Sequence, residues 1–257
     1  MERNEHLDRR AFLTRAGLVG AAAASGAWGW AGAAQAGDGL SRPLRVVIGE
    51  STRGRPIRAY LIGSRQARNR YVVLGQMHGD EPAGPYVVLN RLLDAEPLED
   101  IALWLIPTIN PDGRRRGTRT NARGVDLNRN FPSRTWVYNG RGTRYYSGPR
   151  PASEPETRAL VRFLTRVEPR TVISLHQPLA SVDFSGGDED VTRWLARHLG
   201  LPVANIQVSG GGTMTSWFNR EFRQKTAVTV ELPPSASGEY RKKVAEVLLL
   251  HAQRRRV

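Results

Sequence analysis

The 257-residue sequence contains no cysteine. This absence excludes disulfide bridges and thiolate metal sites, so any bound metal must rely on histidine and carboxylate ligands. Aromatic residues make up only 7% of the chain, which leaves few side chains for stacking on nucleic acid bases. No nucleic-acid-binding motif is present either. A formal charge of +14 favours anionic partners in general, and we interpret it as a basic solvated surface rather than a nucleic-acid footprint.

Long hydrophobic runs are also missing, and no stretch after residue 36 is apolar enough to span a bilayer. The first 36 residues have a different character. Arg9 and Arg10 precede an Ala/Gly-rich run from Ala16 to Ala34, and Ala34-Gln-Ala36 fits a small-residue cleavage site. This segment resembles a twin-arginine export signal. We therefore expect a mature chain of residues 37–257 in the periplasm or outside the cell, with an uncleaved membrane tether as the alternative.

Apolar strands alternate with helical stripes along the mature chain, which is 40% hydrophobic over the whole sequence and suits one domain. Strands are expected at residues 45–49, 57–62, 71–75, 102–106, 171–175 and 227–230. Helices are expected at residues 84–94, 160–167, 191–199 and 244–248. This alternation predicts an α/β fold, a single domain in which helices flank a mixed, mostly parallel twisted sheet.

Three local patterns carry more specific expectations. Asn110-Pro-Asp-Gly113 is a strong turn signal. Ser153 followed by Glu156 is the pattern of a capping box at the start of a helix. Residues 114–148 show little periodicity, and an irregular segment of this length is usually either functional or disordered.

Three of the predicted strands end in a residue that can bind a metal or act as a base. His78 and Glu81 follow strand 71–75, His176 ends strand 171–175, and Glu231 ends strand 227–230. A histidine and a glutamate three residues apart can share one zinc ion, but such pairs are also common in surface loops. Sites in open α/β sheets form at the carboxyl ends of strands. The three endings together therefore predict a site better than any one of them does.

Several motifs occur together in a fixed order between residues 78 and 231, over most of the mature chain. They are His78-Gly-Asp-Glu81, Asn110-Pro-Asp-Gly113, Gly117-Thr-Arg119, Gly124-Val-Asp-Leu-Asn-Arg-Asn-Phe131, Gly148-Pro-Arg-Pro-Ala-Ser-Glu-Pro-Glu156, Ser174-Leu-His176 and Thr229-Val-Glu231. With this set the sequence resembles the zinc carboxypeptidase family, and within that family it is similar to the bacterial murein peptide amidases.

The resemblance implies one zinc ion per chain, held by His78, Glu81 and His176 with the fourth position open. Three protein ligands and one open position are typical of a catalytic zinc. Glu231 matches the general base of the family. Taken without the other motifs, Glu231 would be interpreted as a solvent-facing residue at the end of a strand.

The irregular segment carries the remaining residues that the resemblance identifies. Arg119 matches the arginine that polarises the scissile carbonyl, and Asn128 with Arg129 matches the pair that binds the terminal carboxylate of the substrate. A guanidinium suits a planar carboxylate because it donates two parallel hydrogen bonds. The simpler interpretation of each arginine is a surface charge, and Arg123 is an alternative to Arg119 because the two are close in sequence.

One position departs from the pattern of the digestive members of the family. Alignment on Ser209-Gly-Gly211 places Ile206 where those enzymes carry a mobile tyrosine, so a tyrosine proton donor is in doubt. A specificity pocket around residues 213–217 cannot be inferred by analogy either. His198 and His251 continue apolar helical stripes, and we interpret both as packed helix residues rather than ligands.

The export signal and the resemblance together suggest a peptidoglycan substrate, L-Ala-γ-D-Glu-meso-diaminopimelate, cleaved before the diaminopimelate. Its carboxylates would suit the arginines of residues 114–129. Two alternatives stay open within enzymes: a general metallocarboxypeptidase acting on peptide C-termini, and an amino-acid deacylase, against which the Gly124–Phe131 run argues. A non-catalytic cell-wall-binding protein is the alternative outside enzymes.

Overall fold

A computed structural model describes residues 43–81, 85–96, 98–184, 186–206 and 211–254 of the protein, so the predicted export signal lies outside the described residues. No helix within these ranges has the length and apolar character needed to cross a membrane. The strands are β1 (Leu44–Glu50), β2 (Pro56–Gly63), β3 (Asn69–Gln76), β4 (Ile101–Thr108), β5 (Thr171–His176), β6 (Ser181–Asp183), β7 (Val203–Ala204) and β8 (Thr226–Glu231). The helices are α2 (Pro85–Leu92), α3 (Pro111–Arg116), the 3₁₀ helix η1 (Leu127–Arg129), α4 (Pro155–Val167), α5 (Glu189–Leu199), α6 (Met214–Glu221) and α7 (Gly238–Gln253).

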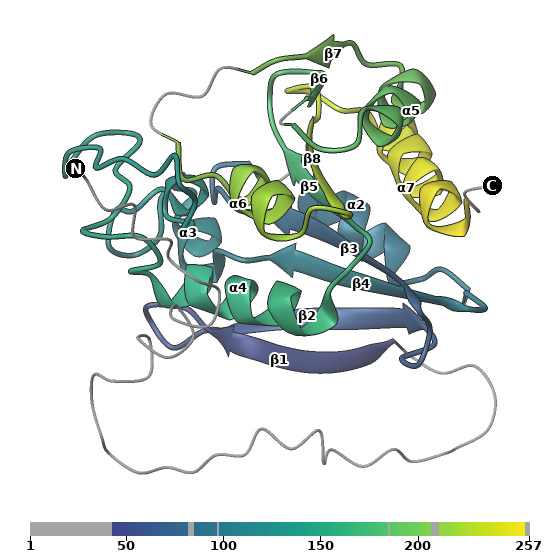
Figure 1. The fold of residues 1–257 in the computed structure, drawn as a ribbon, viewed down its shortest axis with the longest axis horizontal. Helices are drawn as coiled ribbons and strands as arrows, with labels where there is room; N and C mark the ends of the chain where they lie inside the picture. Colours follow the sequence, from purple (N-terminus) through teal and green to yellow (C-terminus); the bar gives the residue numbers. More distant parts are fainter. Residues whose placement is uncertain (1–42, 82–84, 97, 185, 207–210, 255–257) are drawn as a thin grey trace, which may run out of the picture. The chain divides into compact units, whose positions relative to one another are not determined.

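The strands form one mixed sheet in the order β1-β2-β4-β3-β5-β8-β6-β7 (Figure 1). Its centre is parallel, since β4, β3, β5 and β8 all run in the same direction. Antiparallel strands extend it on both sides, β2 beside β4 and β6 beside β8. The α/β class and the six predicted strands are thereby confirmed. The two strands that were not predicted, β6 and β7, are only three and two residues long, too short to show a hydrophobic period.

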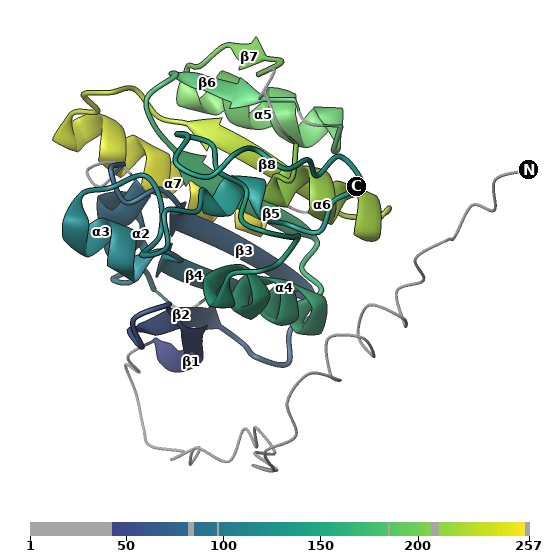
Figure 2. The ribbon, with the colours of Figure 1, turned by 90° about the vertical axis from the view of Figure 1, so that its left-hand side faces the viewer.

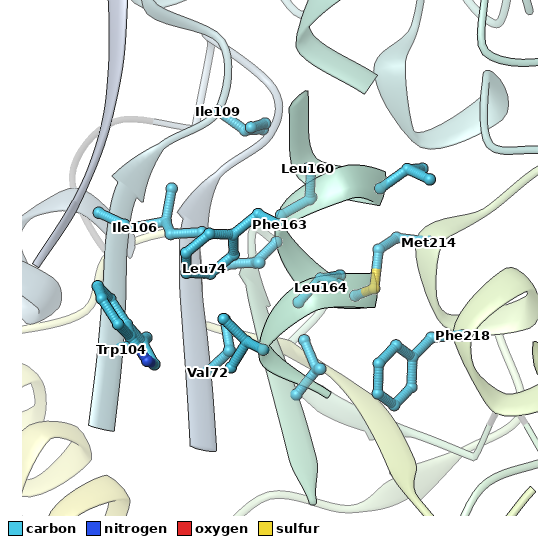
Figure 3. Packing of buried hydrophobic residues seen from close by; sticks show 14 of the residues in the cluster. Val72, Leu74, Trp104, Ile106, Ile109, Leu160, Phe163, Leu164, Met214 and Phe218 are labelled. Carbon is cyan, nitrogen blue, oxygen red and sulfur yellow. The ribbon is translucent and has the colours of Figure 1, made fainter. Parts of the chain in front are cut away.

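Both faces of the sheet are covered, which explains the continuous apolar character of its central strands. Side chains alternate along β3, so Val72 and Leu74 belong to one core cluster and Val73 to the other. The first cluster packs β3 and β4 against α4 and α6, with Leu164 and Phe218 among the contributing helix residues (Figure 3). The second cluster lies under α2, α5 and α7. Figure 2 shows α2 and α7 on one side of the sheet and α4 and α6 on the other.

The predicted turn at Asn110-Pro-Asp-Gly113 is wrong, because these residues begin α3. Asn110 is the N-cap residue, and its Oδ1 accepts a hydrogen bond from the backbone N–H of Gly113 at 2.8 Å. Pro111 occupies the first helical position, where its missing N–H has no cost. The same residue types that favour a turn therefore also favour a capped helix start.

The predicted capping box is also wrong. Helix α4 has Glu154 as its N-cap residue, without a side-chain cap hydrogen bond, and Ser153 Oγ instead donates to Glu154 Oε1 at 2.8 Å. The Glu156 carboxylate accepts from the backbone N–H of Thr52 at 2.8 Å and from Asn121 Nδ2 at 3.2 Å. Burial raises the pKa of Glu156. Tertiary contacts thus use the glutamate that local sequence assigns to the cap.

Two buried asparagines order the irregular segment that follows α3. Asn121 Oδ1 accepts from the backbone N–H groups of Arg123 and Val125, while its Nδ2 donates to Glu154 Oε2 at 2.8 Å. Asn130 Nδ2 donates to the carbonyl of Ser147 at 2.8 Å. These side chains satisfy backbone groups that have no helix or strand partner. The segment is therefore built to hold particular side chains in place.

Candidate metal centre and active site

The three predicted ligands come together at one edge of the sheet. His78 and Glu81 lie in the turn after β3, and His176 is the last residue of the neighbouring parallel strand β5. His78 Nδ1 lies 2.7 Å from Glu81 Oε1, His176 Nδ1 lies 3.1 Å from Glu81 Oε2, and the two Nδ1 atoms are 3.3 Å apart. All three side chains are buried. The structure thus confirms the predicted ligand set.

This donor set fits zinc. Ligand atoms around a tetrahedral zinc at about 2.0–2.2 Å lie roughly 3.3–3.6 Å from one another. The two Nδ1 atoms are 3.3 Å apart, within this range, whereas the contacts of the Glu81 oxygens, 2.7 and 3.1 Å, are shorter. Two imidazole nitrogens with one carboxylate are typical zinc ligands. His78, Glu81 and His176 form the metal-binding triad of the protein.

The far nitrogen of each histidine has its own partner. His78 Nε2 lies 3.0 Å from Asp126 Oδ1, and His176 Nε2 lies 3.1 Å from Ser174 Oγ. These contacts leave Nδ1 of both rings facing the common point, as the outer partners of metal-binding histidines usually do. Asp126 was not singled out in the sequence, although it lies inside the Gly124–Phe131 motif.

The charges of the site favour a cation. Burial alone would lower the pKa of His78, but the carboxylates of Glu81 and Asp126 outweigh burial and raise it to about 9. Burial opposes the ionisation of Glu81 as well, yet His78 and His176 hold the pKa of Glu81 below its ordinary value. The carboxylates of Glu81 and Asp126 are therefore ionised at neutral pH, and their buried negative charge attracts a positive ion.

A second motif supports the metal-binding turn. A Cβ atom on Gly79 would lie 2.0 Å from the carbonyl carbon of Gly113, so the turn and α3 pack backbone to backbone. Asn110 Nδ2 donates to the carbonyl of Met77 at 3.1 Å, and Gln76 Nε2 donates to the carbonyl of Gly79 at 3.0 Å. The Asn-Pro-Asp-Gly motif thus positions His78, a role that its turn-like composition does not reveal.

Arg119 lies beside the metal-binding triad. Its Nε and Nη2 donate to Asp126 Oδ2 at 3.0 and 2.8 Å, and its Nη1 is 3.7 Å from Glu81 Oε1. The alternative residue, Arg123, has a side chain that is 57% exposed and pairs with Glu154 at 3.6 Å. The structure therefore brings Arg119, and not Arg123, to the site.

Asn128 and Arg129 form the short helix η1, which Asp126 caps by accepting from the backbone N–H of Asn128 at 3.0 Å. Asn128 Oδ1 accepts from the backbone N–H of Met214 at 3.0 Å. Arg129 is buried and its Nη1 donates to the carbonyl of Asn128 at 2.8 Å. Burial lowers the pKa of Arg129, but a guanidinium remains charged in proteins. A buried positive charge thus lies in the segment that carries Arg119.

Glu231 ends β8 on the same edge of the sheet. It is the register partner of His176 in β5 and of Ser181 in β6, and its Oε2 accepts from the backbone N–H of Leu179 at 3.4 Å. Burial raises the pKa of Glu231, while the nearby His176 acts in the opposite direction. The carboxylate therefore stands beside the metal-binding triad in a partly desolvated position.

The remaining positions that the sequence raised lie elsewhere. The backbone N–H of Ile206 donates to Asp183 Oδ1 at 2.8 Å, and residues 207–210 lie outside the described residues. Trp217 is buried in the core, with its ring centroid 5.9 Å from that of Phe131.

The two other histidines of the folded part are packed helix residues, as predicted. His198 stacks on Trp194 with ring centroids 3.9 Å apart, and its Nδ1 lies 2.8 Å from the Trp194 carbonyl. His251 is buried on α7, edge-on to Tyr71. Both contacts lie on the face of the sheet that α2, α5 and α7 cover, rather than at the edge that carries the metal-binding triad.

Comparison with known proteins agrees with this site. The family model described as "Zinc carboxypeptidase" matches residues 41–189, a range that contains all three metal ligands and ends before Glu231. Murein peptide amidase A of Vibrio campbellii is 33% identical over 198 residues, which cover 72% of this chain and 78% of that protein.

Solved structures show the same architecture. The murein-tripeptide amidase from Escherichia coli O157 superposes with a TM-score of 0.72 at 28% identity, covering 85% of this chain and 95% of that one. Carboxypeptidase A from Helicoverpa armigera has a TM-score of 0.69 at 18% identity, covering 82% of this chain and 68% of that one. The second similarity is one of fold.

Asp126→Asn is expected to weaken zinc binding about 10- to 100-fold, because the partner of His78 Nε2 loses its charge. The measurement is a competition titration with a chromogenic chelator. Asp188→Asn is the matched control, since Asp188 caps α5 and asparagine is also a good cap. Equal zinc affinities for Asp126→Asn and the unmodified protein would contradict the role of Asp126.

Proposed function

Since the chain belongs to the zinc carboxypeptidase family of hydrolases, we propose that it releases meso-diaminopimelate from peptidoglycan stem peptides by hydrolysing the γ-D-Glu–diaminopimelate bond. The observation that carries this proposal is the meeting of His78, Glu81 and His176 beside Arg119. The choice of substrate is supported by relatives that are named murein peptide amidase A and that match this chain over most of their length.

His78, Glu81 and His176 would hold the zinc ion, which would supply Lewis-acid chemistry and bring the pKa of water toward about 7. Glu231 is the proposed general base: it accepts a proton from the attacking water and passes that proton to the leaving amino group. Its place beside His176 at the edge of the sheet supports this role. A partly desolvated carboxylate of raised pKa is also the better proton acceptor, as long as it is ionised.

Arg119 is the proposed stabiliser of the oxyanion that forms from the scissile carbonyl. Asp126 holds its guanidinium through Nε and Nη2, so that Nη1 faces the metal-binding triad without further reorganisation. Arg129 and Asn128 are the proposed partners of the terminal carboxylate. Because Asn128 Oδ1 is used by Met214, its Nδ2 is the atom left for an anionic acceptor.

The composition of the irregular segment supports a substrate with several negative charges. Residues 111–150 contain ten arginines, only two aspartates and no glutamate. The exposed arginines of this range include Arg114, Arg115, Arg116, Arg134, Arg141, Arg144 and Arg150. A single-sign cluster of this kind attracts anionic ligands and orients them. The stem tripeptide, with its several carboxylates, matches this charge better than an ordinary peptide does.

A general metallocarboxypeptidase on peptide C-termini is the second candidate. Arg129 and Asn128 would recognise any terminal carboxylate, so the site by itself does not require diaminopimelate. An amino-acid deacylase would use the same metal-binding triad. A cell-wall-binding protein without activity would have no use for a carboxylate such as Glu231 beside the metal-binding triad.

Export completes the proposal, because a peptidoglycan substrate lies outside the cytoplasm or passes through the periplasm. Arg9, Arg10 and the small residues that end at Ala36 support a twin-arginine signal and cleavage after Ala36. The mature protein would then begin at Gly37.

Incubation of the zinc-loaded protein with L-Ala-γ-D-Glu-meso-diaminopimelate is expected to release diaminopimelate, and chelator should stop the release. Mass spectrometry on a panel that includes plain peptides of similar length measures the preference. Release from plain peptides alone would overturn the murein substrate and favour the general carboxypeptidase.

Glu231→Gln is expected to lower kcat by about 10²–10⁴-fold with unchanged zinc content, because the amide cannot accept the proton. Glu221→Gln, at an exposed position, is the control. For the unmodified protein, kcat/KM should fall as the pH drops through the pKa of Glu231, since the base must be ionised. Burial raises that pKa, so the fall should begin above the usual glutamate value of about 4.3. Undiminished turnover by Glu231→Gln would remove the proposed base.

Replacement of Arg9 and Arg10 by lysine is expected to keep the protein in the cytoplasm of a bacterium that has the twin-arginine pathway. Cell fractionation and N-terminal sequencing of the exported form measure this, with Gly37 expected as the first residue. Full-length protein in the membrane fraction would instead support an uncleaved tether.

A further inference from the structure

One tyrosine lies against both arginines of the proposed site, although no sequence motif pointed to it. The Tyr145 ring centroid is 5.4 Å from Arg119 Cζ and 5.2 Å from Arg129 Cζ. Both distances fall within the range of cation–π contacts. Tyr145 itself is 38% exposed, so the ring borders both the buried guanidiniums and solvent.

The backbone next to Tyr145 is tied to the centre of the site. Its neighbour Tyr146 is buried, and the carbonyl of Tyr146 accepts from the backbone N–H of Asp126 at 2.8 Å. Asp126 is also the residue that holds Arg119 and His78. Asp126 therefore links the backbone beside Tyr145 to the metal-binding triad and fixes the position of this part of the loop.

The Tyr145 ring lies beside two positive charges, those of Arg119 and Arg129. The side chain of Arg119 is only 14% exposed and Arg129 is buried, so the two like charges repel across a poorly solvated space. Burial lowers the pKa of Arg129 and the charge of Arg119 acts in the same direction, whereas the carboxylate of Asp126 raises it. An aromatic ring attracts both guanidiniums, and cation–π contacts are stronger where water is excluded.

We propose that Tyr145 is a positioning residue for carboxylate recognition: its ring contacts both guanidiniums and holds that of Arg129 in the orientation that receives the terminal carboxylate of the substrate, whereas Asp126 already holds that of Arg119. This inference rests on the proposed function of Arg129. It predicts an effect on substrate binding and on the preference for a free carboxylate, and a much smaller effect on the chemical step.

Tyr138 provides a matched control from the same irregular segment. It is 60% exposed, and its ring packs edge-on against Tyr146 with centroids 6.2 Å apart. A loss of bulk or of loop order would affect variants at both positions. A loss of guanidinium positioning would affect only variants at Tyr145.

Tyr145→Ala is expected to raise KM for a substrate with a free terminal carboxylate about tenfold, with kcat changed less than about threefold. The ratio of kcat/KM for the carboxylate over the terminal amide of the same peptide should fall by a similar factor. Tyr145→Phe keeps the ring and should restore values close to those of the unmodified enzyme. Tyr138→Ala should match the unmodified enzyme, and Tyr145→Leu replaces Tyr145→Ala if the latter does not fold.

Unchanged KM and unchanged carboxylate preference in Tyr145→Ala would overturn the inference. So would parallel losses in Tyr138→Ala, or a fall in kcat alone together with a lower Tm, because these indicate a structural role. The kinetics use whichever peptide the unmodified enzyme cleaves, so failure of the murein substrate leaves this test intact. If no peptide is cleaved, the proposed function fails. Calorimetric binding of the stem tripeptide and its C-terminal amide to zinc-loaded protein then tests Tyr145 by the same tenfold criterion.

Discussion

The buried carboxylate of Asp126 connects the metal ligand His78 with the irregular segment that carries Arg119 and Asn128. Its Oδ1 contacts His78 Nε2 and accepts from the backbone of Asn128, its Oδ2 accepts two hydrogen bonds from Arg119, and its backbone N–H donates to Tyr146. Burial alone would raise the pKa of Asp126, but His78 and Arg119 outweigh it and keep the group ionised. An unpaired charge at this depth would be strongly destabilising. Metal ligand, arginines and loop must therefore adopt their positions together.

The sheet determines where that aspartate can act. Because β3, β5 and β8 are adjacent and parallel, their carboxyl ends deliver His78, Glu81, His176 and Glu231 to one edge. The cores on the two faces hold these strands in register, as the packing of Val72 and Leu74 against α4 and α6 illustrates (Figure 3). Gly79 in the metal-binding turn packs against the backbone of Gly113 in α3 so closely that a side chain at position 79 would not fit. Rigid elements thus carry the metal ligands and the proposed base.

The sequence predicts this half of the site well, because each residue follows a strand whose apolar run is visible by itself. Asp126 and Tyr145 escape prediction, since their importance arises from contacts with residues far away in the sequence. The capping box was predicted wrongly for the same reason. Ser153 and Glu156 have the right spacing, but the Glu156 carboxylate accepts hydrogen bonds from Thr52 and Asn121 instead of from the helix terminus. Asn110 shows the converse, since one composition fits both a turn and a capped helix. The predicted export signal and residues 207–210 lie outside the described residues.

The metal ligands and the proposed substrate-binding residues consequently come from different kinds of structure. The ends of the central strands supply the metal ligands and Glu231, with His78 and Glu81 in the turn after β3, whereas the irregular segment supplies Arg119, Asn128, Arg129 and Tyr145. Substitutions in such a segment alter side chains without disturbing strand pairing, because asparagine side chains rather than a sheet hold its backbone. Relatives of this chain carry different names, murein peptide amidase and carboxypeptidase. In this chain residues 111–150 contain ten arginines, two aspartates and no glutamate, so the proposed preference for a stem peptide with several carboxylates rests on the charge of this segment rather than on the metal ligands.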